Sequence, residues 1–264
     1  MSKIFINIIY TIFAFLMLLY ILLFIFQRKL LYFPTNSNDS LVKEILKEYP
    51  KSLITIKLKK DITLKGYFIE KSDKAVLYFG GNAENIEYFI NNNNSFFDKI
   101  SLASFYYRGY GLSTGKINQK NLFKDALRIY DYLIKEKNIK EIVVMGRSLG
   151  TGVATYLAYK RKVTKVILIS PYDSILKIAL EKFPFISKFM IKDRYESEKY
   201  ANKINYPLLA IYSKSDMVVT SKHSKALIKK WRGNTKIIEL DRESHSSITN
   251  NKMVWKEIYK FIEK

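Results

Sequence analysis

Cysteine is absent from the 264 residues of this chain. Its absence excludes a disulfide scaffold, a thiolate zinc site and a cysteine nucleophile. It does not indicate whether the chain is located in an oxidising or a reducing compartment, because a chain without thiols tolerates either. Histidine is scarce as well, because His223 and His245 are the only two. A three-histidine metal site is therefore excluded, and a mechanism that needs an imidazole has two candidates.

Glycine and proline, at 10 and 5 residues, are too few for a collagenous or proline-rich segment. Apolar residues make up 48% of the chain and charged residues 26%. This composition suits one globular domain with a short additional segment and argues against a disordered chain.

Acidic residues are outnumbered 24 to 45 by basic ones, which gives a formal net charge of +21. Such a surplus can mark proteins that bind nucleic acids or anionic membranes. However, only 8 of the basic residues are arginine, the preferred side chain for gripping bases and phosphates. The lysines are spread over the whole chain, so we interpret them mainly as a solvated surface and expect no nucleic-acid partner.

Charge is missing altogether from residues 4–26, an apolar run of 23 residues. At about 1.5 Å per residue, a helix of this length covers about 35 Å and crosses a hydrocarbon core of about 30 Å. A cleaved signal peptide has a shorter apolar core, about 7–15 residues, that ends at small residues. Here Phe-Gln-Arg-Lys follows at 26–29 instead. We predict an uncleaved single-pass anchor within residues 1–29, and flanking charges favour, by about one charge, a cytoplasmic position for residues 30–264.

The globular part, residues 30–264, alternates between strand and helix patterns after a polar linker at 35–40. Strand patterns at 53–59 and 63–70 are joined by Lys60-Asp61, which indicates a hairpin. Further strand patterns cover 75–79, 101–107, 141–145, 165–170, 207–212 and 236–240, and helical patterns cover 118–137, 149–159, 221–231 and 253–262. This order predicts a mostly parallel twisted sheet with helices on both faces.

Two stretches interrupt the alternation. Residues 172–205 are partly helical and rich in Phe and Ile, as a cap-like insertion over a site would be. The asparagine tract at 91–94 is interpreted as a solvated turn.

The pentapeptide Gly-Arg-Ser-Leu-Gly at 146–150 follows an apolar strand and opens a helix. In this context G-x-S-x-G is the nucleophile elbow, a sharp turn that lifts Ser148 off the strand end. The free N–H of Leu149 at the helix start is positioned to stabilise an oxyanion.

A serine hydroxyl at neutral pH needs a base, and the base needs an orienting carboxylate. His245 lies in a loop after the last strand pattern, whereas His223 falls in a polar helix and is interpreted as a surface residue. For the carboxylate we favour Asp216, which follows the strand at 207–212. Asp173, just after the strand at 165–170, and Asp241, close to His245 in sequence, remain alternatives.

The loop after the strand at 75–79 contains Gly80-Gly81-Asn82, and we assign the second oxyanion donor to the N–H of Asn82. A further glycine-rich stretch at 109–115 reads G-x-G-x-x-x-G. Because this is not the G-x-G-x-x-G of dinucleotide sites and no helix pattern begins there, we interpret it as a structural loop.

Several motifs together resemble the α/β-hydrolase superfamily, and within it the small single-pass membrane α/β-hydrolases. They are Leu-Tyr-Phe-Pro at 31–34, Gly-Asn-Ala-Glu-Asn at 81–85, Tyr-Arg-Gly-Tyr-Gly-Leu-Ser-Thr-Gly at 107–115, Gly-Arg-Ser-Leu-Gly-Thr-Gly at 146–152, and the loops of Asp216 and His245. Two positions depart from the family pattern. Gly80-Gly81-Asn82 stands where the family usually has His-Gly-Asn, and Tyr106 stands where it usually has Asp.

These residues predict a membrane-anchored serine hydrolase that cleaves carboxylic esters or thioesters through an acyl-enzyme, with the triad Ser148, Asp216 and His245. No metal or organic cofactor is implied. The anchor and the apolar 172–205 stretch favour lipids or lipidated proteins as substrates, and the net charge of +18 over residues 30–264 favours anionic lipid surfaces. A peptidase of the same fold, a catalytically silent membrane-bound binding protein and a basic nucleic-acid binder are the alternatives, the last disfavoured by the scarcity of arginine.

Overall fold

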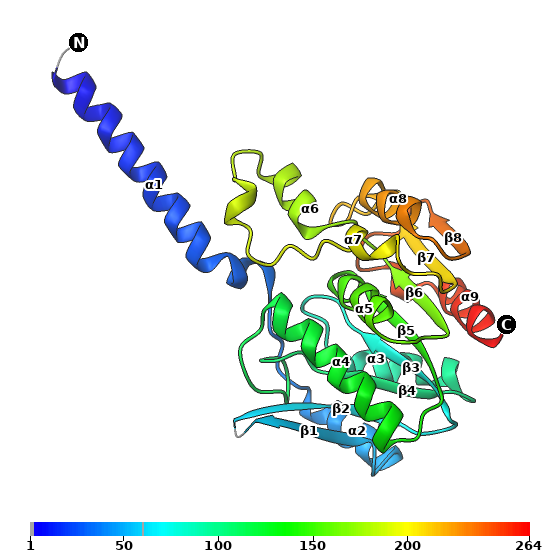
Figure 1. Ribbon diagram of the computed structural model, residues 1–264. Coiled ribbons are helices and arrows are strands. Elements are labelled where there is room, and N and C mark those ends of the chain that lie inside the picture. The colour runs from blue at the N-terminus through cyan, green and yellow to red at the C-terminus, as the bar shows by residue number, and fades with distance from the viewer. Residues whose placement is uncertain (1–2, 60) are drawn as a thin grey trace.

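A computed structural model describes residues 3–59 and 61–264 (Figure 1). Its α-helices are α1 Lys3–Leu31, α2 Asp39–Glu48, α3 Ile86–Asn93, α4 Gln119–Glu136, α5 Leu149–Lys160, α6 Ile175–Lys182, α7 Glu198–Ala201, α8 Ser221–Lys230 and α9 Lys252–Glu263. Three short 3-10 helices are η1 Asn94–Phe97, η2 Lys188–Met190 and η3 Ile248–Asn250. The strands are β1 Leu53–Lys59, β2 Ile62–Ile69, β3 Lys74–Phe79, β4 Ser101–Phe105, β5 Glu141–Arg147, β6 Lys165–Ile169, β7 Leu208–Ser213 and β8 Thr235–Leu240.

The strands form one sheet in the order β1-β2-β4-β3-β5-β6-β7-β8. β1 and β2 pair antiparallel, β2 pairs antiparallel with β4, and the pairs from β4 to β8 are parallel. The carboxyl ends of β3, β5, β6, β7 and β8 therefore meet at one edge of the sheet. In the predicted hairpin between β1 and β2, Lys60 lies outside the described residues.

The side chains of the central strands alternate between two apolar layers, as the two-residue period of a strand dictates. In β3, Ala75, Leu77 and Phe79 enter one layer, and Val76 and Tyr78 enter the other. Helices α4, α5 and α8 contribute to the first layer, and α3 and α9 to the second. The prediction of a mostly parallel sheet with helices on both faces is confirmed.

Helix α1 projects from the domain, and its residues are almost all exposed (Figure 1). By length and composition it is able to cross a membrane. Its C-terminal half contacts the segment 172–205, and its last residue, Leu31, also accepts a hydrogen bond from Asn82. We call this segment, which connects β6 to β7 and holds α6, η2 and α7, the cap segment; its function as a cap stays a prediction.

The asparagine tract is not a solvated turn. Residues 91–94 close α3 and begin η1, and both Asn93 and Asn94 are buried. The side chain of Asn94 accepts a hydrogen bond from Lys71 Nζ at 2.8 Å and donates one to the Tyr49 hydroxyl at 2.7 Å. These distant partners satisfy the amide of Asn94, so the second half of the tract packs inside, whereas Asn91 and Asn92 are exposed.

The predicted linker at 35–40 is also more ordered than expected. The N–H of Gly111 donates to the Thr35 carbonyl at 2.7 Å, and the Asn85 side chain donates to the Asn36 carbonyl at 3.2 Å. Helix α2, which no pattern predicted, begins at Asp39. Asn38 caps it by accepting hydrogen bonds from the N–H groups of Ser40 and Leu41.

Candidate active site

The turn between β5 and α5 has the backbone geometry of a nucleophile elbow. Ser148 has φ +47° and ψ −117°, a region that side chains rarely adopt. The turn is possible because two glycines flank it. A Cβ on Gly146 would lie 2.4 Å from the Gly150 carbonyl oxygen, and a Cβ on Gly150 would lie 2.0 Å from the Phe79 carbonyl oxygen.

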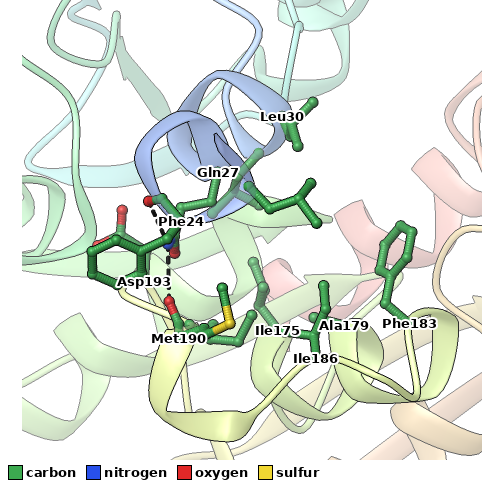
Figure 2. Close-up of a pocket in the computed structure, with 12 residues that line it drawn as sticks. Phe24, Gln27, Leu30, Ile175, Ala179, Phe183, Ile186, Met190 and Asp193 are labelled. Atoms are coloured by element: carbon green, nitrogen blue, oxygen red, sulfur yellow. Dashed lines mark hydrogen bonds between the residues drawn. The ribbon is translucent and has the colours of Figure 1, made fainter. Parts of the chain in front are cut away.

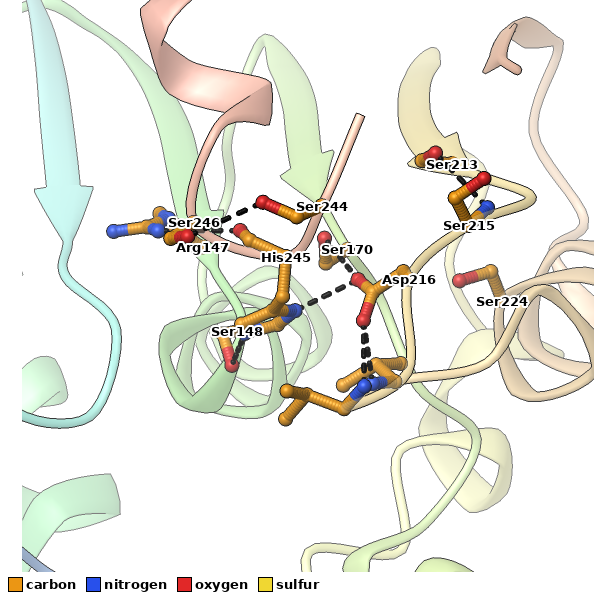
Figure 3. Close-up of polar contacts among 12 residues, drawn as sticks. Arg147, Ser148, Ser170, Ser213, Ser215, Asp216, Ser224, Ser244, His245 and Ser246 are labelled. Atoms are coloured by element: carbon orange, nitrogen blue, oxygen red, sulfur yellow. Dashed lines mark hydrogen bonds and ion pairs between the residues drawn. The ribbon is translucent and has the colours of Figure 1, made fainter. Parts of the chain in front are cut away.

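The structure joins Ser148, His245 and Asp216 in one chain of hydrogen bonds (Figure 3). His245 Nε2 lies 2.9 Å from Ser148 Oγ, and His245 Nδ1 lies 2.7 Å from Asp216 Oδ2. The three residues come from loops that follow β5, β7 and β8, at the sheet edge where these parallel strands end. In the neutral tautomer the Nδ1–H donates to the carboxylate, which leaves Nε2 free to accept the serine proton.

Asp216 is buried and accepts hydrogen bonds at both carboxylate oxygens. Oδ1 accepts the N–H groups of Val218 and Val219 at 2.9 and 2.8 Å, and Oδ2 accepts the Ser170 hydroxyl at 3.0 Å in addition to His245. Burial raises the pKa of the Asp216 carboxyl, but the hydrogen bond and charge of His245 and the two N–H donors outweigh it. The net effect lowers the pKa below its ordinary value, so the group stays ionised at neutral pH.

The alternative carboxylates have other partners. Asp241 is exposed and pairs with Lys214 at 2.7 Å. Asp173 is buried, but it accepts a hydrogen bond from His223 Nδ1 at 2.8 Å. His223 is therefore not a surface residue, which corrects the sequence interpretation. The inner face of α8 packs against the loop after β6, and Asp173 satisfies the imidazole there.

The predicted oxyanion loop lies beside the nucleophile, since a Cβ on Gly81 would lie 3.6 Å from Ser148 Cβ. Among residues 3–59 and 61–264, the N–H groups of Asn82 and Leu149 donate to no acceptor. Ala83, the next residue in the loop, has φ +59°, so the loop turns sharply after Asn82. Two free amides near Ser148 are what an oxyanion hole requires, although their role stays a prediction.

The side chain of Asn82 is held on three sides. Its Nδ2 donates to the Leu31 carbonyl at 2.7 Å, and its Oδ1 accepts the Phe33 N–H at 3.0 Å and the Tyr110 hydroxyl at 2.8 Å. The end of α1 and the segment after it therefore fix this loop. The loop holds Gly80-Gly81-Asn82 at the position where the family that the sequence resembles usually has His-Gly-Asn. The glycine-rich stretch at 109–115, which supplies Tyr110, forms a loop as predicted.

A partly buried ion pair beside the loop was not predicted. Glu84 Oε2 accepts the Gly81 N–H at 2.7 Å and Arg147 Nη1 at 2.9 Å, and Arg147 Nη2 donates to the His245 carbonyl at 3.3 Å. The Tyr78 hydroxyl donates to Glu84 Oε1 at 2.6 Å. This network connects the oxyanion loop, the elbow and the histidine loop. The sequence contained one signal for this ion pair. Arg147 lies inside G-x-S-x-G, between a buried strand and a helix, where a charged side chain needs a partner.

No group of three histidine or carboxylate side chains able to hold a metal ion occurs in the described part of the chain, that is, outside residues 1, 2 and 60. Tyr106, at a position where the family that the sequence resembles usually has Asp, donates to the Glu87 carboxylate.

Comparisons with known proteins agree with this fold. A family model described as alpha/beta hydrolase fold matches residues 74–195. Human alpha/beta hydrolase domain-containing protein 17B is 30% identical over 154 residues, which cover 56% of this chain and 51% of that protein. An uncharacterised protein of Mycobacterium tuberculosis is 29% identical over 132 residues, 49% of this chain and 47% of the relative. The chain thus spans about half the length of these relatives.

Solved structures match over more of the chain at lower identity. Est1E from Butyrivibrio proteoclasticus is similar with a TM-score of 0.66 and 16% identity, over 80% of this chain and 98% of that one. The Pyrococcus furiosus esterase Pf2001 is similar with a TM-score of 0.65 and 16% identity, over 88% of this chain and 97% of that one. At such identities the likeness establishes the fold alone.

Proposed function

Because the chain belongs to the α/β-hydrolase superfamily, we propose that it is a membrane-anchored serine hydrolase that cleaves carboxylic esters or thioesters through an acyl-enzyme. The observation that carries the proposal is the hydrogen-bonded chain from Ser148 through His245 to Asp216, which has the order and the spacing of a catalytic triad.

In the acylation step, Ser148 Oγ attacks the substrate carbonyl carbon and His245 Nε2 takes the serine proton. Asp216 stabilises the imidazolium that forms and keeps the ring in the productive tautomer. The carbonyl oxygen becomes an oxyanion, which accepts hydrogen bonds from the N–H groups of Leu149 and Asn82.

The tetrahedral intermediate then collapses. The bond to the alcohol or thiol breaks, and His245 hands its proton to that leaving group. A water molecule takes the place of the leaving group, His245 removes a proton from it, and hydrolysis of the acyl-enzyme returns Ser148 to its free form.

Esters rather than amides are proposed as substrates, partly because esterases share the fold. The apolar helix α1 would hold the site close to a bilayer, which favours acyl esters of lipids or of lipidated proteins. The net charge of +18 outside the anchor attracts the domain to anionic lipid surfaces. We propose a single span over residues 4–26 and a cytoplasmic catalytic domain.

A fluorophosphonate probe tests the proposal on the full-length protein in detergent or nanodiscs. We expect covalent labelling of the peptide that contains Ser148, and none in Ser148→Ala. Ser215→Ala removes an exposed hydroxyl outside the hydrogen-bonded chain and should label like the parent. An unlabelled, folded parent would contradict the proposal and favour a catalytically silent binding protein. Faster turnover of peptide amides than of matched esters would favour a peptidase.

The position of the domain relative to the membrane is testable because the chain has no cysteine. Lys229→Cys places one thiol on an exposed position of α8. If the domain is cytoplasmic, a membrane-impermeant maleimide should label this thiol in lysed cells only. Labelling in intact cells would place the domain on the outer side.

A further inference from the structure

A cavity of about 450 Å³ lies between the last turns of α1 and the cap segment (Figure 2). Ten of its twelve lining residues are apolar. Leu30 of α1 lies across this space from Ile175 and Ala179 of α6, and Met190 lies beside Ile175. Its volume and apolar walls are typical of small-molecule binding sites, and the cavity is distinct from the hydrogen-bonded chain at Ser148.

Polar contacts hold the cap segment against α1 and keep the cavity in shape. Gln27 donates from Nε2 to the Met190 carbonyl at 2.9 Å and accepts the Lys192 N–H at Oε1 at 2.8 Å. Arg28 pairs with the buried Asp193 at 2.8 Å. The Tyr20 hydroxyl donates to the Phe185 carbonyl. The two walls of the cavity are thus docked on each other at several points along the helix.

These contacts place the cap segment at membrane depth. Tyr20 lies six residues before the end of the proposed span at residue 26, which is about 9 Å along the helix axis. A segment docked at Tyr20 therefore reaches into the hydrocarbon region, not only to its surface. The same segment exposes Phe183, Phe185 and Phe189 by 57%, 88% and 78%. Exposed aromatic side chains at this depth are typical of an element that inserts among the acyl chains of a membrane.

One residue that lines the cavity is bonded to the oxyanion loop. Leu31 lines the cavity, and its carbonyl accepts Asn82 Nδ2 at 2.7 Å. Asn82 follows Gly81, whose Cα lies beside the Ser148 side chain. On the opposite wall, Ile175 begins α6, which follows the loop after β6. Leu31 therefore links the cavity to the loop beside Ser148, and the exposed Phe183 lines the same cavity.

We propose that this cavity binds the acyl chain of the substrate, which enters laterally from the bilayer between α1 and the cap segment. The proposal deepens the proposed function and rests on it for the catalytic consequence, because a chain in the cavity presents its carbonyl group toward Ser148. Binding itself does not require catalysis, since the apolar walls are present without the triad.

The binding is tested directly with the full-length Ser148→Ala protein in nanodiscs that contain a phospholipid with a diazirine on its acyl chain. After irradiation, mass spectrometry should find adducts on cavity residues of the cap segment, such as Ala179 in α6 and Ile186 after it. Adducts confined to the outer face of α1 would overturn the proposal. This readout is independent of hydrolysis, so it stands even if the protein has no esterase activity.

The catalytic consequence is tested with Ala179→Trp, which fills the cavity. We expect kcat/KM for p-nitrophenyl palmitate to fall at least tenfold, while kcat/KM for the butyrate ester stays within twofold. Lys182→Trp adds the same indole to an exposed position of α6 outside the cavity, and should change neither value more than twofold. An unchanged palmitate-to-butyrate ratio in Ala179→Trp would overturn the proposal, whereas a parent that hydrolyses neither ester would contradict the proposed function instead.

Discussion

At the scale of single residues, the environment of Asp216 separates this carboxylate from the other acidic side chains near the sheet edge. It receives hydrogen bonds from the backbone of its own loop, from Ser170 and from His245. Four donors around one buried carboxylate stabilise its charged form. Ser170 directly follows β6, the strand beside β5, and only the order of the strands brings its hydroxyl to Asp216.

The lowered pKa of Asp216 makes the stability of the protein depend on pH in the acid range. Because the folded-state pKa lies below the ordinary value of 3.8, the contribution of this group to the free energy of unfolding is fully present above about pH 4. It is lost as the pH falls through the folded-state pKa. We expect the free energy of unfolding of Asp216→Asn, measured with urea, to vary less between pH 4 and pH 2 than that of the parent.

The control for this measurement is Asp241→Asn, because the side chain of Asp241 is 74% exposed. This variant should retain the pH dependence of the parent. Equal slopes in all three proteins would show that the contacts of Asp216 do not stabilise its carboxylate.

Arg147 should act as a positioning residue, because it holds Glu84 with one nitrogen and the His245 carbonyl with another. A lysine keeps the charge but has no planar fork to hold both partners. We expect Arg147→Lys to lower kcat for ester hydrolysis about 10- to 100-fold, the cost of a misplaced catalytic group, with little change in KM.

Arg161→Lys is the matched control, since Arg161 makes a comparable fork with Asp131 on the surface, at the opposite end of α5 from Ser148. Its kcat should stay close to that of the parent. If both variants lose kcat equally, or if Arg147→Lys raises KM alone, the positioning role is wrong.

At the scale of elements, the elbow depends on the close approach of α5 to β3. The backbone of Gly150 packs on the Phe79 carbonyl, and no side chain fits between them. We expect Gly150→Ala to lower the free energy of unfolding by about 3 kcal/mol, because an added methyl in a packed contact forces the backbone to shift. Thermal unfolding followed by circular dichroism measures the change.

Gly80→Ala provides the comparison, since its added Cβ would lie no closer than 3.5 Å to any neighbour. Its stability should change by no more than about 0.5 kcal/mol. Equal losses in the two variants would show that close packing at the elbow is not the cause.

At the scale of the whole molecule, the apolar helix is part of the domain as well as a candidate anchor. Arg28 pairs with Asp193, whose side chain is only 5% exposed and also accepts the Tyr32 hydroxyl at 3.1 Å. A chain that begins at residue 30 leaves this buried carboxylate without its cation. Because Arg28 itself is 44% exposed, we expect that chain to be about 1–2 kcal/mol less stable than one that begins at residue 27.

Asp193→Asn in the shorter chain checks the cause. A neutral amide costs less to bury than an unpaired carboxylate, so this substitution should recover part of the loss in chemical unfolding. A shorter chain as stable as the longer one would show that the ion pair contributes nothing measurable.

Local patterns in the sequence were sufficient for the strands, for the long helices of the globular part and for their order, although they missed α2. The alternation of apolar residues in the strands, the period of α4 and the glycines around Ser148 are consequences of short-range geometry, which neighbouring residues determine among themselves. The long apolar run at 4–26 indicates an anchor for the same reason, because its length and composition need no tertiary partner.

Tertiary structure alone decided which groups meet. His223 and Asn94 look like surface residues in sequence, yet both are buried because partners far along the chain satisfy their polar atoms. Asp173, Asp216 and Asp241 all lie in loops that follow strands, and only the packing of these loops brings Asp216 to His245. Contacts between residues 97 positions apart, such as Ser148 and His245, depend on strand order and loop path, which no local periodicity encodes.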